Sequence, residues 1–167
     1  MNGLKIEETK MNKIRQSLFF IIVGTNGTGK TTLLNELIKR DGGYYSPRES
    51  SQLKIVPNSI EVLNYTKSKG YLNIVISNQP DVSRGYLSEI DLNKMTNTLY
   101  DKLTIDDVFY CLHDDGMCKC RKPLPGLIFN AQNKWNIDLS KSMMVGDTWK
   151  DGDAAKNAKV KFTLLDR

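Results

Sequence analysis

Short apolar runs alternate with segments of helical spacing along most of this chain, and that alternation limits the folds open to it. The apolar runs at residues 18–23, 72–77, 108–112, 142–145 and 161–165 predict short strands buried on both faces. The segments between them predict helices at residues 31–40, 59–69, 88–103, 125–135 and 149–158. Strands that alternate with helices predict an α/β fold, a Rossmann-like three-layer sandwich with a central parallel sheet.

Several of the predicted helices carry start or stop signals. Ser88 is a predicted N-cap because Asp91 follows it three residues later. Pro125 suits the beginning of its helix, where a missing backbone N–H leaves no hydrogen bond unmade. Gly42 and Gly43 directly follow residues 31–40 and Asp41, and they predict that this helix ends there.

The size and composition of the chain predict one globular domain without a membrane segment. Its 167 residues are expected to form a polar lead-in (residues 1–16) and a single α/β domain (residues 17–167). No apolar run approaches the roughly 20 residues that cross a bilayer, and no signal peptide is recognised at the N-terminus. A net charge of +5 suits a protein that handles phosphate anions. The lysines are scattered, so we expect no nucleic-acid partner.

All three cysteines and the single histidine fall within ten residues, as Cys111, His113, Cys118 and Cys120. The paired C-x-H and C-x-C spacing supplies four ligands, the number that a closed tetrahedral zinc site needs. A closed site leaves no position for a substrate, so the predicted zinc is structural and staples a zinc-binding loop. The alternative is three unrelated thiols and a solvent-exposed histidine. Cysteines committed to a metal fit a reducing compartment, so a cytoplasmic location is the default expectation.

Polar residues lie at the points where predicted strands end. Ser77 ends the strand at 72–77, Asp147 follows the strand at 142–145, and Lys122 follows the predicted zinc loop. In open parallel sheets, ligands bind at the carboxyl ends of the strands. We therefore expect Ser77, Lys122 and Asp147 to converge at one edge of the sheet and to attract phosphate or Mg²⁺. Taken singly, each has an ordinary alternative role as a cap or a surface residue.

Three patterns, read in chain order, resemble three of the four signature motifs of the haloacid dehalogenase (HAD) superfamily of phosphatases. They are Ser-Asn-Gln with a later Arg-Gly (77–85), Cys-Arg-Lys-Pro-x-Pro-Gly (120–126) and Gly-Asp with a later Asp (146–151), and the cysteine and histidine loop (111–120) is an insert between the first two. The combination is similar to subclass IIIA, in the branch of D-glycero-D-manno-heptose 1,7-bisphosphate phosphatases and histidinol phosphatases. This resemblance covers about residues 44–167. It implies a Mg²⁺-dependent hydrolase of a small phosphorylated metabolite in carbohydrate metabolism, and a monomer.

The resemblance also implies a role for each matching residue. Ser77 and Lys122 would be catalytic residues that hold the phosphoryl oxygens, because a phosphoryl group carries spread negative charge. Asp147 would bind Mg²⁺, with Asp151 as its supporting acid. The residues that would contact the rest of the substrate are Asn78, Arg84 and Arg121, with the two arginines facing a second anionic group.

The first motif of that superfamily, an Asp-x-Asp pair at the end of the first strand, has no full counterpart here. After Val23 the two positions hold Gly24 and Asn26, and neither can serve as nucleophile or as acid and base. A second register places Lys39 at the nucleophile position and Asp41 at the acid/base position, but Lys39 falls in the predicted helix. Asp41 is thus the remaining candidate catalytic carboxylate, and we expect phosphatase turnover to be weak or absent.

The same segment satisfies G-x-x-x-x-G-K-[ST], the pattern of a Walker A phosphate loop between a strand and a helix. The candidate loop residues are Gly24, Asn26, Gly27, Gly29, Lys30 and Thr31. In such a loop backbone N–H groups wrap a phosphate, the lysine neutralises it and the threonine can ligate Mg²⁺. Residues 20–40 resemble the opening of nucleoside-monophosphate-type P-loop kinases, so ATP or GTP is a candidate ligand. We expect residues 17–43 to form a P-loop-like βα unit in place of the usual first motif.

Three functions remain open from the sequence. The first is a zinc-stapled, Mg²⁺-dependent phosphatase of sugar bisphosphates or histidinol phosphate with a degenerate nucleophile loop. The second is a P-loop nucleotide-binding protein or a remnant of a small-molecule kinase on a HAD scaffold. The third is a non-catalytic protein that binds a phosphorylated ligand. The position of the phosphate-loop segment relative to Ser77, Lys122 and Asp147 would distinguish one shared site from two.

Overall fold

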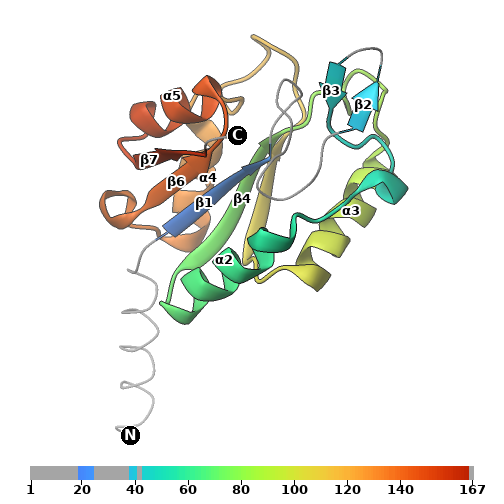
Figure 1. The fold of residues 1–167 in the computed structure, drawn as a ribbon. Coiled ribbons are helices and arrows are strands. Elements are labelled where there is room, and N and C mark those ends of the chain that lie inside the picture. The colour runs from blue at the N-terminus through green and yellow to red at the C-terminus, as the bar shows by residue number, and fades with distance from the viewer. Residues whose placement is uncertain (1–18, 25–37, 41–42, 166–167) are drawn as a thin grey trace, which may run out of the picture.

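The computed structural model describes residues 19–24, 38–40 and 43–165 and places a parallel β-sheet at the centre of the molecule (Figure 1). Its strands are β1 (Phe19–Gly24), β4 (Leu72–Asn78), β5 (Asp107–Cys111), β6 (Met143–Gly146) and β7 (Lys161–Leu164). Their order in the sheet is β5-β4-β1-β6-β7, and every neighbouring pair is parallel. The chain therefore begins its sheet in the middle and adds strands outward on both sides.

Helices follow the strands in alternation. The α-helices among the described residues are α2 (Pro57–Ser68), α3 (Glu89–Lys102), α4 (Gly126–Trp135) and α5 (Trp149–Asn157). The described part of the chain also contains two short 3₁₀ turns, η1 (Ser50–Gln52) and η2 (Leu139–Lys141). The Ser88 hydroxyl accepts a hydrogen bond from the backbone N–H of Asp91, so the predicted N-cap of α3 is confirmed.

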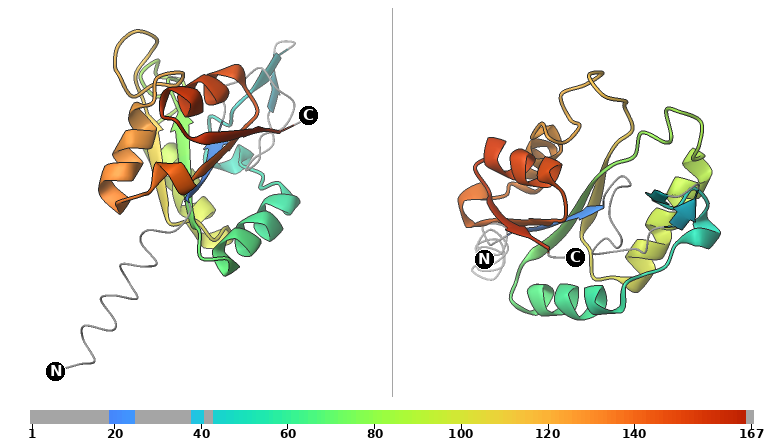
Figure 2. Two further views of the ribbon diagram at one scale, coloured as in Figure 1. Left: turned by 90° about the vertical axis from the view of Figure 1, so that its left-hand side faces the viewer. Right: turned by 45° about the horizontal axis from the view of Figure 1, so that its top comes forward.

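The two faces of the sheet are covered by different helices, which gives three layers (Figure 2). Along β4, Ile74 and Ile76 pack with residues of α4 and α5, while Val75 between them packs with Leu63 of α2 and Leu99 of α3. This alternation follows from the two-residue period of a strand, which points successive side chains to opposite faces. Each such side chain contributes about 1.5–3 kcal/mol when fully buried. The predicted three-layer α/β sandwich is confirmed.

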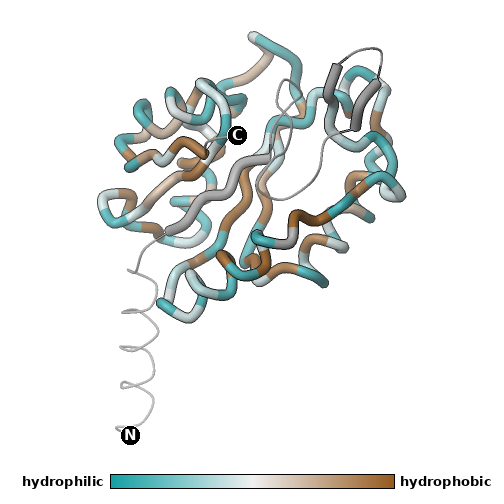
Figure 3. Tube along the Cα trace, in the orientation of Figure 1, coloured by the Kyte–Doolittle hydropathy of each residue, from teal (hydrophilic) through white to brown (hydrophobic). Residues whose placement is uncertain are grey.

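The apolar character of the centre is visible along the chain trace, where β4 is among the most hydrophobic segments (Figure 3). β4 is buried at every residue after Leu72, as expected of a strand covered on both faces. No helix in the described ranges has the length and apolarity needed to cross a membrane.

The predicted helix at residues 31–40 is wrong at its end. Residues 38–40 form strand β2 (Ile38–Arg40), which pairs antiparallel with β3 (Gly43–Tyr45) and places Lys39 opposite Tyr44. Aromatic and β-branched residues favour a strand once a partner strand is available, and the Tyr-Tyr pair supplies one. Residues 31–37 lie outside the described residues. Lys39 is therefore in a peripheral hairpin (Figure 1) and not at the end of a strand of the central sheet.

Candidate functional site

Three strand ends lie side by side at the carboxyl edge of the sheet. Gly24, the last residue of β1, is in register with Ser77 of the neighbouring β4. On the other side of β1, Ile22 is in register with Val145 of β6. Asp147 directly follows Gly146, the last residue of β6. This edge is where an open parallel sheet binds its ligands, and Gly24 is at its middle.

Lys122 brings a buried positive charge to this edge. Its side chain is 3% exposed, and its Nζ lies 2.9 Å from Oδ1 of Asp151. The same Nζ donates a hydrogen bond to the carbonyl of Ile76 at 3.3 Å, which places it beside Ser77. Burial lowers the pKa of Lys122, while the charges of Asp151 and Asp147 oppose that shift. Lys122 thus lies beside Ser77 and senses the charge of Asp147, and the convergence of all three residues stays a prediction.

Asn78 fixes the backbone of Lys122. The Asn78 side chain accepts a hydrogen bond from the Lys122 N–H at 3.1 Å and donates one to the Lys122 carbonyl at 3.0 Å. These two bonds imitate strand pairing and lock the Lys122 backbone to the end of β4. Gln79 donates a hydrogen bond from Nε2 to the Ser77 hydroxyl at 3.0 Å. Asn78, expected from the resemblance to contact substrate, is placed here as a residue that positions Lys122.

Asp151 joins Lys122 to the start of α5. Its second carboxylate oxygen, Oδ2, accepts hydrogen bonds from the Thr148 backbone N–H at 3.0 Å and from the Thr148 hydroxyl at 2.6 Å. These contacts form a capping box at the beginning of α5. A Cβ at Gly146 would lie 2.5 Å from Cβ of Asp151, so only glycine allows this approach. Oδ1 of Asp151 forms the ion pair with Lys122 and Oδ2 accepts hydrogen bonds from Thr148, which suits a supporting residue.

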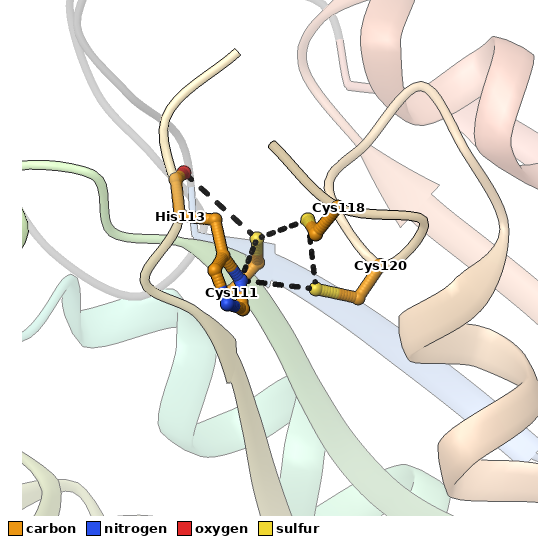
Figure 4. Close-up of side chains that lie close together, drawn as sticks. All are labelled: Cys111, His113, Cys118 and Cys120. Carbon is orange, nitrogen blue, oxygen red and sulfur yellow. Dashed lines mark hydrogen bonds between the residues drawn. The ribbon is translucent and has the colours of Figure 1, made fainter. Parts of the chain in front are cut away.

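The four predicted zinc ligands point toward one another (Figure 4). Their donor atoms all lie within 4.8 Å of one another. The Sγ atoms of Cys111 and Cys118 are 3.4 Å apart, and Nδ1 of His113 lies 3.7 Å from Sγ of Cys111 and 3.6 Å from Sγ of Cys120. A tetrahedral zinc with metal–sulfur bonds of about 2.3 Å requires donor separations of about 3.5–3.8 Å. The Sγ atoms of Cys118 and Cys120 are closer, at 3.1 Å, so it is the donor set and its gathering around one point that fit a zinc ion.

The loop from Cys111 to Cys120, called the zinc loop below, is anchored at both ends. Cys111 is the last residue of β5, and it is fully buried. At the other end, a Cβ on Gly126 would lie 2.4 Å from the Lys119 carbonyl, so the first residue of α4 must be glycine for the loop to pack there. A sheet strand and a helix start thus bring the two ligand pairs together.

The two predicted substrate arginines are both paired with carboxylates of the zinc loop. Arg84 donates from Nε and Nη2 to Asp114 at 2.8 and 2.5 Å. Arg121 donates from Nε to Asp115 at 2.5 Å and from Nη1 to the His113 carbonyl at 3.2 Å. The Arg84 guanidinium lowers the pKa of Asp114 to about 2. Sequence reasoning missed Asp114 and Asp115, although two acidic residues next to each other in a loop flanked by arginine motifs were a usable signal.

Six predicted site residues lie outside the described residues, so the structure places none of them. They are Asn26, Gly27, Gly29, Lys30, Thr31 and Asp41. Only the first glycine of the phosphate-loop pattern, Gly24, is placed, at the end of β1.

Comparison with known proteins assigns this chain to a family. The family model described as haloacid dehalogenase-like hydrolase matches residues 28–165. The chain belongs to this family. A D-glycero-beta-D-manno-heptose-1,7-bisphosphate 7-phosphatase of Pasteurella multocida is 38% identical over 137 residues, covering 75% of this chain and 73% of the relative. The enzyme with the same name from Helicobacter pylori strain J99 is 35% identical over 147 residues, covering 83% of each chain.

A solved structure supports the fold. The D,D-heptose 1,7-bisphosphate phosphatase of B. bronchiseptica, crystallised with magnesium and phosphate, superposes with a TM-score of 0.71 and 24% identity, covering 89% of this chain and 80% of that one. The family match and the two relatives, not this structure, confirm the predicted superfamily for this chain. The family match begins at residue 28, so Gly24 and Asn26 precede it while Lys30 and Thr31 lie inside it. The resemblance of residues 20–40 to kinases has no counterpart in these matches.

Proposed function

We propose that this HAD hydrolase binds the phosphate of a sugar bisphosphate at the carboxyl edge of its sheet, as a phosphatase site would. The observation that carries the proposal is the buried Lys122–Asp151 ion pair, held beside Ser77 and within reach of Asp147. A buried lysine needs an anionic partner, and the strand ends around it are where ligands of such sheets bind. The names of the relatives favour D-glycero-manno-heptose 1,7-bisphosphate over histidinol phosphate as the substrate class.

The chemistry of the edge suits a phosphoryl group. The Ser77 hydroxyl and the Lys122 ammonium would hold two phosphoryl oxygens and neutralise part of their charge. Asp147 offers carboxylate oxygens, which Mg²⁺ prefers as ligands, and it directly follows β6, the strand that pairs with β1. A bound Mg²⁺ would supply Lewis-acid stabilisation of the phosphoryl oxygens. Asp151 contributes indirectly, because it keeps Lys122 at the end of β4.

We further propose that turnover is weak, because the strand end nearest this phosphate site lacks a carboxylate. Hydrolysis through a phosphoryl-enzyme needs a side-chain oxygen that attacks phosphorus while the sugar hydroxyl leaves, and then an acid/base group that activates water. Gly24 ends β1 beside Ser77 and has no side chain. In the alternative register the nucleophile position holds Lys39. This residue lies in the β2–β3 hairpin and carries an amine in place of a carboxylate. Asp41 remains the candidate acid/base of that register.

The proposed zinc ligands are Cys111, His113, Cys118 and Cys120, with a structural role. Four protein donors close the coordination sphere and leave no position for substrate. The zinc would then stabilise the loop that carries the partners of Arg84 and Arg121.

A direct test measures binding and hydrolysis separately. Calorimetry with inorganic phosphate and with a sugar bisphosphate, in the presence of Mg²⁺, should show binding that Lys122→Met abolishes. Release of phosphate from the bisphosphate and from an aryl phosphate should be slow or undetectable. Absence of phosphate binding by the unmodified chain would refute the proposed site. Rapid Mg²⁺-dependent hydrolysis would refute the proposal that turnover is weak.

A second candidate function is nucleotide binding by residues 24–31. The observation in its favour is that Gly24, the first glycine of the Walker A pattern, ends the central strand at the ligand-binding edge. A phosphate loop begins at such a strand end. Binding of ATP or GTP that is lost in Lys30→Ala but kept in Lys122→Met would support this function. Loss in both variants would indicate one shared phosphate site.

A further inference from the structure

The carboxyl edge of the sheet has a buried floor and an exposed rim. Ser77 and Lys122, which would hold a phosphate, are 1% and 3% exposed and belong to the floor. The phosphate of a bound ester would lie at this floor, so the rest of the ligand must extend past the rim toward solvent. Trp149 is the first residue of α5, two residues after Asp147, and it is 66% exposed. This indole is therefore part of the rim.

A continuous set of contacts joins Trp149 to the floor. Nζ of Lys122 lies 2.9 Å from Oδ1 of Asp151. Oδ2 of Asp151 accepts hydrogen bonds from the backbone N–H and the hydroxyl of Thr148. Thr148 is the N-cap of α5 and the chain neighbour of Trp149. Because a capping box fixes this backbone, the indole has a defined origin relative to Lys122.

The indole of Trp149 is not used by the fold. The buried residues of α5 are Asp151, Ala154 and Ala155, and Trp149 does not belong to the apolar clusters of the described residues. Its N–H has no hydrogen-bond partner in the described part of the chain, and Nζ of Lys150 lies 5.7 Å from the ring centroid. A tryptophan can bury roughly 150–250 Å². Trp149 thus offers an apolar face and a donor that the protein leaves in water.

The zinc loop borders the same stretch of rim. Lys150 directly follows Trp149 in α5. The hydrogen bond from Arg121 lowers the pKa of Asp115 in the zinc loop, and the charge of Lys150 adds to this shift. Charges in water are largely screened beyond about 10 Å, so the start of α5 and the zinc loop are neighbours. The loop adds Met117, which is 74% exposed. Apolar side chains from two elements therefore border the way out of the floor.

We propose that Trp149 is a specificity-determining residue, which receives the sugar ring of a cyclic phosphate ester on its indole face. This inference rests on the proposed function, because Ser77 and Lys122 would hold the phosphate. A sugar ring has apolar C–H faces and a border of hydroxyls, and the exposed indole has an apolar face and one donor. Stacking of the two removes apolar area from water. The site should therefore prefer cyclic sugar phosphates over short open-chain esters such as glycerol 3-phosphate.

The first measurement follows the fluorescence of Trp149. The chain has two tryptophans, and Trp135→Phe leaves Trp149 as the only one. Trp135 donates a hydrogen bond to Asp107, the first residue of β5, so it lies at the opposite edge of the sheet. With Mg²⁺, a cyclic sugar bisphosphate should shift the Trp149 emission to shorter wavelength and protect it from acrylamide quenching, because the ring covers the indole. Inorganic phosphate should bind without either change.

The second measurement is calorimetry with Mg²⁺ on Trp149→Ala in the full chain. Affinity for the sugar bisphosphate should fall about tenfold, which corresponds to about 1.4 kcal/mol. Affinities for inorganic phosphate and for glycerol 3-phosphate should not change. Trp149→Phe keeps an aromatic face and should retain part of the bisphosphate affinity.

The matched control is Tyr65→Ala. Tyr65 is 64% exposed and lies in the last turn of α2, which leads into the first residue of β4 at the opposite edge of the sheet. Removing this aromatic side chain should change none of the affinities. Thermal melts of all variants identify any that fail to fold.

The possible results separate this inference from the proposed function. Unchanged Trp149 emission on binding of the sugar bisphosphate would overturn the role of the indole, and so would equal losses of affinity for phosphate and bisphosphate in Trp149→Ala. Emission that depends on protein concentration without ligand would overturn it as well, since a second copy of the chain would then cover the indole. In these cases phosphate still binds and the proposed function stands. If the wild-type chain binds neither inorganic phosphate nor a phosphate ester, the proposed function fails and the inference fails with it.

Discussion

Asp151 illustrates how one side chain can serve two structural tasks near the site. One carboxylate oxygen faces Lys122 and the other caps α5 through Thr148. The residue is 1% exposed, so its charge is removed from water and depends on these partners. A buried pair is costly to break because the remaining charge has no compensation.

At this scale we expect Asp151→Asn to destabilise the protein by about 3–5 kcal/mol, because Lys122 would be left buried without its ion-pair partner. Urea unfolding followed by circular dichroism measures the change. The matched control is Asp153→Asn, which removes the same charge from an exposed position two residues further along α5. Equal losses of unfolding free energy in the two variants would show that the Lys122–Asp151 pair stabilises the protein no more than an exposed carboxylate does.

At the scale of elements, Asp107 connects the first residue of β5 to the end of α4. Its carboxylate accepts hydrogen bonds from Trp135 Nε1 at 2.7 Å and pairs with Lys134 Nζ at 2.7 Å. Burial by itself would raise the pKa of Asp107, but the hydrogen bonds from Lys134 and Trp135 outweigh it, and the pKa lies below its usual 3.8. This network fixes a helix end to an edge strand.

The lowered pKa of Asp107 makes the stability of the folded protein depend on pH. Because the folded-state pKa is lowered, the contribution of Asp107 is fully present above about pH 4 and is lost as the pH falls through the folded-state value. We expect Asp107→Asn to cost about 1.5 kcal/mol at neutral pH, the usual loss for hydrogen bonds to a charged group. The gap between the two proteins should shrink toward pH 2. Unfolding curves read by Trp135 fluorescence test this, and a gap that stays constant with pH would contradict it.

The zinc loop is the second element whose stability can be tested by itself. We expect metal analysis to find about one zinc per chain and Cys120→Ala to lose it, because a structural site contributes its binding energy to the fold. Thermal unfolding should shift to lower temperature in the variant and in chelator-treated protein by the same amount. Zinc retained at full stoichiometry in Cys120→Ala would exclude the proposed ligand set.

At the scale of the whole molecule, the question is whether the protein binds phosphate esters without hydrolysing them. The sheet order brings the ends of β4, β1 and β6 together, so a phosphate held by Ser77 and Lys122 would face Gly24. Gly24, the last described residue of β1, offers no side chain that could attack phosphorus, so in our proposal the site binds phosphate but turns it over slowly.

We therefore expect the double substitution Gly24→Asp with Asn26→Asp to raise aryl phosphate hydrolysis at least about tenfold, since it supplies both a nucleophile and an acid/base group. Gly24→Asp alone should do less. The measurement is phosphate release with Mg²⁺, and affinity for phosphate is the accompanying control. A double variant no faster than wild type would mean that the reacting carboxylate enters the site from elsewhere, for example at Asp41.

Local sequence patterns predicted most of the strands and missed β2, whose conformation depends on a partner strand. The runs that became β4, β5, β6 and β7 were found within one or two residues, because buried parallel strands have continuous apolar sequences. The end of the predicted helix at 31–40 became β2, because its conformation depends on pairing with β3. A hairpin partner overrides helical spacing when both segments carry strand-favouring residues.

By itself, the sequence determined the alternation of strands and helices, the donor set of the zinc loop and the order of the phosphate-site motifs. Each of these is a property of neighbouring residues, governed by side-chain period and ligand spacing. Only the tertiary structure decided that β1 lies between β4 and β6, that Lys122 pairs with Asp151, and that Asp114 and Asp115 hold arginines. These contacts form between segments that are far apart in the sequence and that crossover connections bring together. A local pattern describes only neighbouring residues, so it does not reveal such contacts.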